Sequence, residues 1–74
     1  MKPTNVTRAI KSYGEQVCRE AYRLNREVGE GASSIALQLS GLKTTRQADA
    51  AINAGRWLAD QAEYVRLYEN HEIN

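Results

Sequence analysis

The chain lacks most of the features that would assign it to a particular chemistry. A single cysteine, Cys18, cannot form an internal disulfide, which fits a reducing compartment. No apolar run approaches the roughly 18 residues of a membrane span, and the first ten residues contain no apolar signal core. Ten Lys and Arg against nine Asp and Glu leave a net charge of +1, far from the basic excess of a dedicated nucleic-acid binder. We therefore expect a soluble, cytoplasmic protein with no membrane partner.

Catalytic and metal-binding patterns are also missing. The only histidine, His71, lies in the polar segment "YENHEIN", and Cys18 at the edge of an apolar helix face is typical of a packed thiol. There is no HExxH or CxxC, and "GEGASS" lacks the lysine and the preceding strand of a phosphate-binding loop. Asp60 and Glu63 share a helix face with Arg56, which favours a surface group of ion pairs. The sequence predicts a protein that is not an enzyme, with no cofactor, no metal and no small-molecule substrate.

Helical periodicity is the main feature that the sequence does have. Its 74 residues form one domain, residues 1–74, whose core is small because so short a chain buries only roughly 60% of its unfolded surface. No segment alternates apolar with polar residues as a strand does, and Pro3 is the only proline. Glycines mark breaks at residues 29–31 and 40–44. We predict an all-α small helical bundle in the order long, short, long. The expected helices and the polar tail lie at about residues 5–28, 34–40, 45–69 and 70–74.

The first long helix has an apolar face and a basic face. Small residues at Gly14 and Ala21 on the apolar face predict the close approach of another helix, and Gly29 suits the left-handed residue that ends a helix. The basic face is typical of a solvated surface whose charges pair at i,i+4. Residues 1–28 carry a balance of +3 and residues 43–74 a balance of −1, an asymmetry that favours packing of unlike helices over phosphate binding. The apolar positions are Val6, Ile10, Tyr13, Val17, Ala21, Leu24 and Val28.

The last helix is apolar on more than one side. Thr44 and Gln47 have the spacing of a capping box at its start. One apolar face consists mainly of small residues: Ala48, Ala51, Ile52, Gly55, Leu58, Ala59, Ala62 and Val65. A second stripe contains Ala50, Ala54, Trp57, Tyr64 and Tyr68. Together the two cover well over half of the helix circumference, which predicts burial on more than one side.

Two interpretations of the second stripe remain open. In one, the aromatic side chains meet a second copy or another protein; in the other, the first two helices cover them within one chain. Each large aromatic side chain can bury ~150–250 Å², and a helix of eight residues has too little surface to cover them all. Aromatic residues also anchor protein interfaces. We therefore predict that the stripe is an intermolecular surface and that the bundle is completed by a homodimer or higher oligomer.

A helix-turn-helix DNA reader over residues 33–52 is the alternative prediction. Gly41 and Leu42 fit the turn of that motif. Leu37 stands where a small residue lets the helices touch, and Gln47 stands where a buried aliphatic residue should pack. DNA binding is therefore the less favoured function. The only side chains available for contacts with bases and phosphates are Lys43, Arg46 and Gln47.

In outline the chain resembles the short helical regulators that phages and mobile elements encode, such as antirepressors and inhibitors that bind one host or phage protein. The resemblance rests on the size, the helical layout and the surface "AGRWLADQAEYVRLYE". It implies a mechanism of occlusion, in which the protein docks on a partner protein and stops it from working. It names no partner and transfers no site residue to this sequence.

Overall fold

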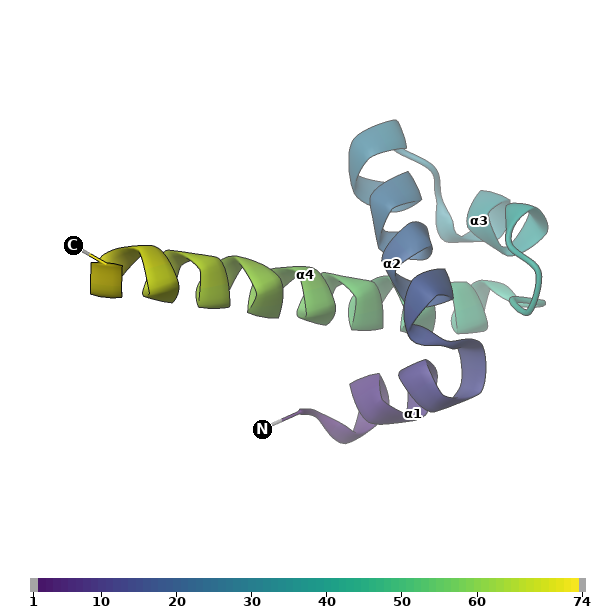
Figure 1. The fold of residues 1–74 in the computed structure, drawn as a ribbon. Coiled ribbons are helices and arrows are strands. Elements are labelled where there is room, and N and C mark those ends of the chain that lie inside the picture. Colours follow the sequence, from purple (N-terminus) through teal and green to yellow (C-terminus); the bar gives the residue numbers. More distant parts are fainter. Residues whose placement is uncertain (1, 74) are drawn as a thin grey trace.

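A computed structural model describes the backbone of residues 2–73 and the side chains of residues 2–66. It confirms the all-α class, since no strand occurs in the described residues (Figure 1). The first three α-helices and a π-helical turn, η1, precede one long C-terminal helix. The elements are α1 (Thr4–Tyr13), α2 (Glu15–Arg23), η1 (Leu24–Val28), α3 (Ala32–Gln38) and α4 (Thr45–Ile73). Because helices α1, α2 and α3 all pack against α4, this helix is the centre of the bundle.

The expected continuous helix over residues 5–28 is wrong, because the chain breaks at Gly14. This glycine has φ +92° and ψ 149°, a conformation that residues with a side chain rarely adopt. Its N–H donates to the Ile10 carbonyl oxygen at 2.8 Å and ends α1. A Cβ added at Gly14 would meet nothing within 4 Å, so this residue turns the chain and does not serve a close helix contact. The turn lets α1 and α2 pack separately against α4.

The two other breaks in the chain agree with the sequence. Gly29 is left-handed, with φ 86° and ψ 18°, and closes the π-helical turn. At that turn the Glu30 N–H donates to the Leu24 carbonyl oxygen at 3.0 Å. Gly41 also has a positive φ, of 95°, in the loop between α3 and α4. Glycine therefore ends α1 and the π-helical turn, whereas the C-cap of α3 is Leu39, two residues before Gly41.

The start of α4 is capped by the pair that the sequence indicates, with one change. The Gln47 N–H donates to Oγ1 of Thr44 at 3.1 Å. Oε1 of Gln47 accepts from the backbone N–H of Lys43 at 2.7 Å, whereas a capping box would use the N–H of Thr44. At the other end, α4 continues to Ile73, so the expected limit at residue 69 and the non-helical tail over residues 70–74 differ from the structure, which does not describe residue 74.

The core lies between α4 and the three preceding helices, and it is built largely from small residues. Alanines supply much of the α4 contribution, and Ile35 and Cys18 are its largest fully buried side chains. Because the alanine side chain is only a methyl group, helices that meet at alanines can pack with a short distance between their axes. The buried apolar residues are Val6, Ala9, Cys18, Ala21, Leu24, Ile35, Leu42, Ala48, Ala51, Ala54 and Leu58.

Gly55 marks a close approach of α2 and α4. A Cβ at this position would lie 2.7 Å from Cβ of Tyr22 and closer still to the carbonyl oxygen of Cys18. No real Cβ tolerates such contacts, so only glycine lets α2 cross α4 here. The small-residue face expected of α4 is therefore the face on which α2 packs.

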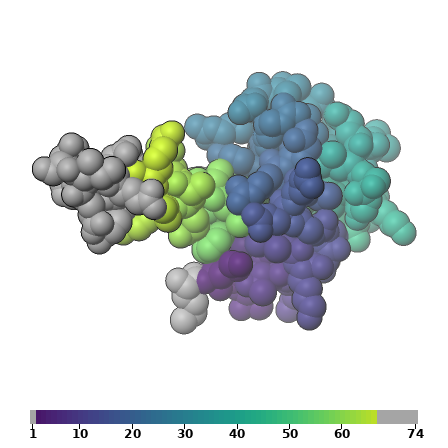
Figure 2. Space-filling model, viewed as in Figure 1, coloured from purple at the N-terminus to yellow at the C-terminus, as the bar shows by residue number. Residues whose placement is uncertain are grey.

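The second half of α4 leaves the bundle. Leu58 is the last buried residue among the described side chains, and every residue from 60 to 66 is exposed. Figure 1 shows α4 continuing well past the other helices, and Figure 2 shows the segment up to residue 66 projecting from the body formed by the first three helices. We call residues 60–73 of α4 the arm.

Candidate functional site

The residues of the predicted aromatic stripe do not share one surface. Ala54 is fully buried, so it belongs to the core of its own chain and cannot contact a partner. Ala50 and Trp57 are half-buried and pack against the core, and Nζ of Lys2 lies 5.7 Å from the centroid of the Trp57 ring. Tyr64 is 66% exposed on the arm, while the side chain of Tyr68 lies outside the described residues. Among the described members of the stripe, only Tyr64 is on an open surface.

The arm exposes apolar residues on a second side as well. Val65, predicted to lie on the small-residue face, is 49% exposed, and Ala62 beside it is also exposed. Where the arm leaves the bundle, the surface is hollowed by about 460 Å³ between α2 and α4. We call this space the arm hollow. It is lined by Arg19, Leu58, Gln61, Ala62, Val65 and Arg66.

The segment that the sequence offers as an alternative helix-turn-helix contains two packed helices in succession. α3 packs on α4, with Ile35 and Leu42 buried between them. Leu37 is 90% exposed, so the two helices do not touch at the position where that motif requires contact. Of the three predicted DNA contacts, Lys43 and Arg46 are exposed, whereas the side-chain oxygen of Gln47 is engaged at the start of α4.

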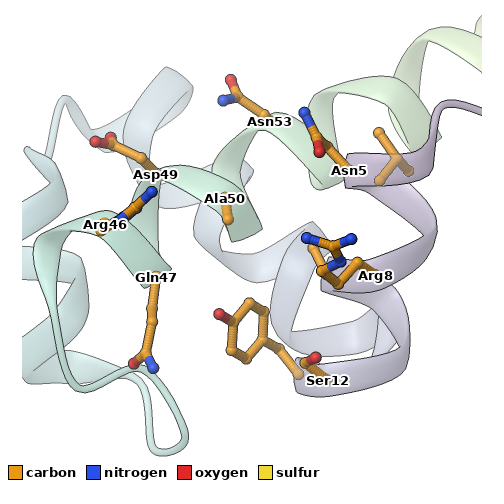
Figure 3. A pocket seen from close by; sticks show the side chains of 11 residues that line it. Asn5, Arg8, Ser12, Arg46, Gln47, Asp49, Ala50 and Asn53 are labelled. Carbon is orange, nitrogen blue, oxygen red and sulfur yellow. The ribbon is translucent and has the colours of Figure 1, made fainter.

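A cleft of about 470 Å³ lies between α1 and the first half of α4. It includes Arg46 and Gln47 from the predicted set, together with residues of α1 that the sequence had not connected to them. Its base contains the buried Val6 and Ala9 and the half-buried Ala50. Figure 3 shows polar side chains of α1 and α4 on the two sides of this space. These polar lining residues are Asn5, Arg8, Ser12, Tyr13, Arg46, Gln47, Asp49 and Asn53.

The cleft carries positive charge that is not neutralised by ion pairs. Ion pairs of the described residues lie elsewhere: on α2 and η1, as Arg19–Glu15, Arg23–Glu20 and Arg23–Glu27, and on the arm, as Arg66–Glu63. None of them involves Arg8 or Arg46, and Asp49 is the one acidic residue that lines the cleft. The charged residues of the cleft lining are therefore two arginines without ion pairs and one aspartate, a local balance of +1.

Cys18, the one cysteine of the sequence, does not line this cleft. Cys18 is fully buried, and burial raises the pKa of its thiol, with the Glu15 carboxylate raising it further. The thiolate is thus disfavoured, as in a packed cysteine. No group of three His, Cys, Asp or Glu side chains suited to a metal ion occurs within residues 2–66, and His71 lies beyond the described side chains.

Comparison with known proteins adds no assignment. No family model, curated protein or solved structure matches this chain. None of the helices over the described residues is long and apolar enough to cross a membrane. The arm and the cleft are therefore the two features on which a function can be argued.

Proposed function

We propose that this chain is a non-enzymatic, protein-binding regulator that associates through the α4 arm and acts by blocking a partner protein. The observation that carries the proposal is the exposure of Tyr64 and Val65 on a helix that has left its own bundle. A helix with apolar residues on two sides and water on all sides gains stability when another surface covers it. Aromatic and aliphatic side chains on a projecting helix are the usual anchors of such an interface.

A second copy of the chain is the first partner that the arm fits. In each copy the arm hollow has an apolar base. Val65, the residue that would enter the hollow of the other copy, is one of the residues that line it. In a two-fold antiparallel crossing, Val65 of each arm enters the hollow of the other, which gives a closed dimer. At the rim, Arg19 is paired with Glu15 and Arg66 with Glu63, so two copies meet without uncompensated like charges.

Occlusion of a different protein is the regulatory step of this proposal. The resemblance to short helical phage regulators points to such a mechanism, and the arm supplies an apolar surface of the kind that covers part of another protein. The same side chains cannot contact a second copy and a different partner at once. The proposal therefore predicts that the partner protein and dimerisation compete for Tyr64 and Val65.

The test is the mass of the protein in solution as a function of concentration. We expect light scattering to show a rise above the 8.3 kDa monomer between about 1 and 100 μM, and Val65→Asn to weaken the dimer about tenfold or more. Asp60→Asn is the matched control, because Asp60 is exposed on the arm but does not line the hollow. The control should stay within about twofold of the unsubstituted chain. A monomer mass throughout, or equal weakening by both substitutions, would contradict the proposed interface.

A further inference from the structure

We propose that the cleft between α1 and α4 binds single-stranded nucleic acid, with one nucleotide unit seated in it. This inference goes beyond the function proposed for the arm and uses a different part of the molecule. The cleft residues come from residues 5–13 and 46–53, whereas the arm begins at residue 60. The two surfaces can therefore be tested separately.

The shape of the cleft favours a strand over a duplex. Its volume of about 470 Å³ lies within the roughly 300–1,000 Å³ of sites that enclose a small ligand. A helix that reads duplex DNA must project so that it can enter the major groove. Here α1 lies beside the exposed side of Arg46 and Asn53, so the surface that they line is concave (Figure 3). A concave site of this size takes one unstacked nucleotide.

The two arginines supply the binding energy for a phosphate. Arg8 stands on α1 and Arg46 on α4, on opposite walls of the cleft, and neither forms an ion pair in the described residues (Figure 3). A guanidinium group binds a phosphate through two parallel hydrogen bonds, and its charge adds to their strength. Lys11 on α1 and Lys43 just before α4 are also exposed and without ion pairs in the described part of the chain, so they add positive charge to the two elements that form the cleft.

The other polar residues distinguish a nucleotide from an acidic peptide. Asp49 can only accept hydrogen bonds when ionised, so it fits the amino group of a base, whereas an acidic side chain offers it no donor. Asn5 and Asn53 offer both donors and acceptors, which match the edge of a base. Tyr13 adds an aromatic ring to the same cleft, and bases stack on aromatic side chains irrespective of sequence. A nucleotide has a phosphate for the arginines, donors and acceptors on the base edge for the polar side chains, and a flat base that can stack on Tyr13.

The experiment measures fluorescence anisotropy of a labelled single-stranded oligonucleotide of mixed sequence, about 10 nucleotides long, at several salt concentrations. We expect the double substitution Arg8→Gln with Arg46→Gln to weaken binding at least tenfold. It should also lower the slope of log affinity against log salt by about 0.7, since each single-strand phosphate contact contributes about 0.7 and both arginines bind the same phosphate. The matched control is Arg26→Gln with Arg56→Gln, which removes the same charge from exposed residues outside the cleft.

The outcomes separate the proposal from its alternatives. If the control protein binds the strand within about twofold of the unsubstituted chain, the result supports binding in the cleft. If both double substitutions weaken binding equally, the effect comes from the overall charge of the protein, which overturns the proposed site. If a free mononucleotide displaces the strand, the result supports a binding site for one nucleotide. Equal displacement by a glutamate-rich peptide of the same charge overturns the role given to the base. Duplex binding as tight as strand binding, with the same dependence on Arg8, overturns the preference for a single strand, and so does the absence of any binding.

Discussion

At the residue scale, Gly55 has the clearest single role in the fold. It lies where α2 crosses α4, and its missing side chain is what allows the backbone of Cys18 to come so near. The sequence contains the signal, since Gly55 stands within a run of small residues on an apolar helix face. Sequence alone does not say which of those small residues marks the crossing, because that depends on how α2 is oriented after the break at Gly14.

Gly55→Ala should therefore destabilise the protein strongly. The added Cβ meets a backbone oxygen, which cannot move aside as a flexible side chain does, so α2 and α4 must separate. We expect a loss of about 3 kcal/mol in the free energy of unfolding, the upper end of the usual cost of overpacking, measured by urea denaturation followed by circular dichroism. Gly31→Ala is the control, because a Cβ there meets nothing within 4 Å and φ is −80°. The control should change stability by no more than about 0.5 kcal/mol. A loss below about 1 kcal/mol for Gly55→Ala would show that the helices are not in such close contact.

At the scale of elements, the periodicity of the sequence predicted helix almost everywhere that helix occurs. The short and last helices were placed within a few residues of their observed bounds, since glycine and a Thr-led cap mark those positions in the sequence. The break at Gly14 was missed because the apolar spacing continues across it, from Tyr13 to Val17, as in an uninterrupted helix. A glycine between apolar positions fits either a close contact or a turn, and only the packing of α1 against α4 decides between them.

The second prediction concerns that break. Gly14→Ala places a side chain at φ +92°, a conformation that costs about 1–3 kcal/mol for a residue other than glycine. We expect the free energy of unfolding to fall by that amount, because α1 can keep its place on α4 only with the strained turn. Urea denaturation measures the loss, and Gly31→Ala again shows the effect of an alanine at an unstrained glycine. An unchanged stability would mean that α1 and α2 join into one helix without loss of packing.

At the scale of the whole molecule, the sequence predicted the excess of apolar surface on the last helix but not its distribution. The spacing placed Ala54 and Tyr64 in one stripe, yet one is in the core and the other is on the arm. The difference arises because the covering helices reach only as far as Leu58, and their length cannot be read from the periodicity of α4 itself. The cleft was missed for a related reason, since its cations come from two helices that the chain brings together only after a turn.

The last prediction separates the body of the protein from its arm. Within residues 2–66, the buried residues lie at or before Leu58, and the residues that line the cleft lie at or before residue 53. A chain that ends after Ala59 should therefore keep its helical fold, and its melting temperature at low concentration should fall by only a few degrees. It should remain a monomer at every concentration, because the exposed apolar residues of the arm are gone. Binding of the single-stranded oligonucleotide should be retained within about threefold, since none of its proposed contacts is removed. A shortened chain that unfolds would show that the arm stabilises the bundle, whereas a folded one that still dimerises would place the interface on the body and contradict the function proposed for the arm.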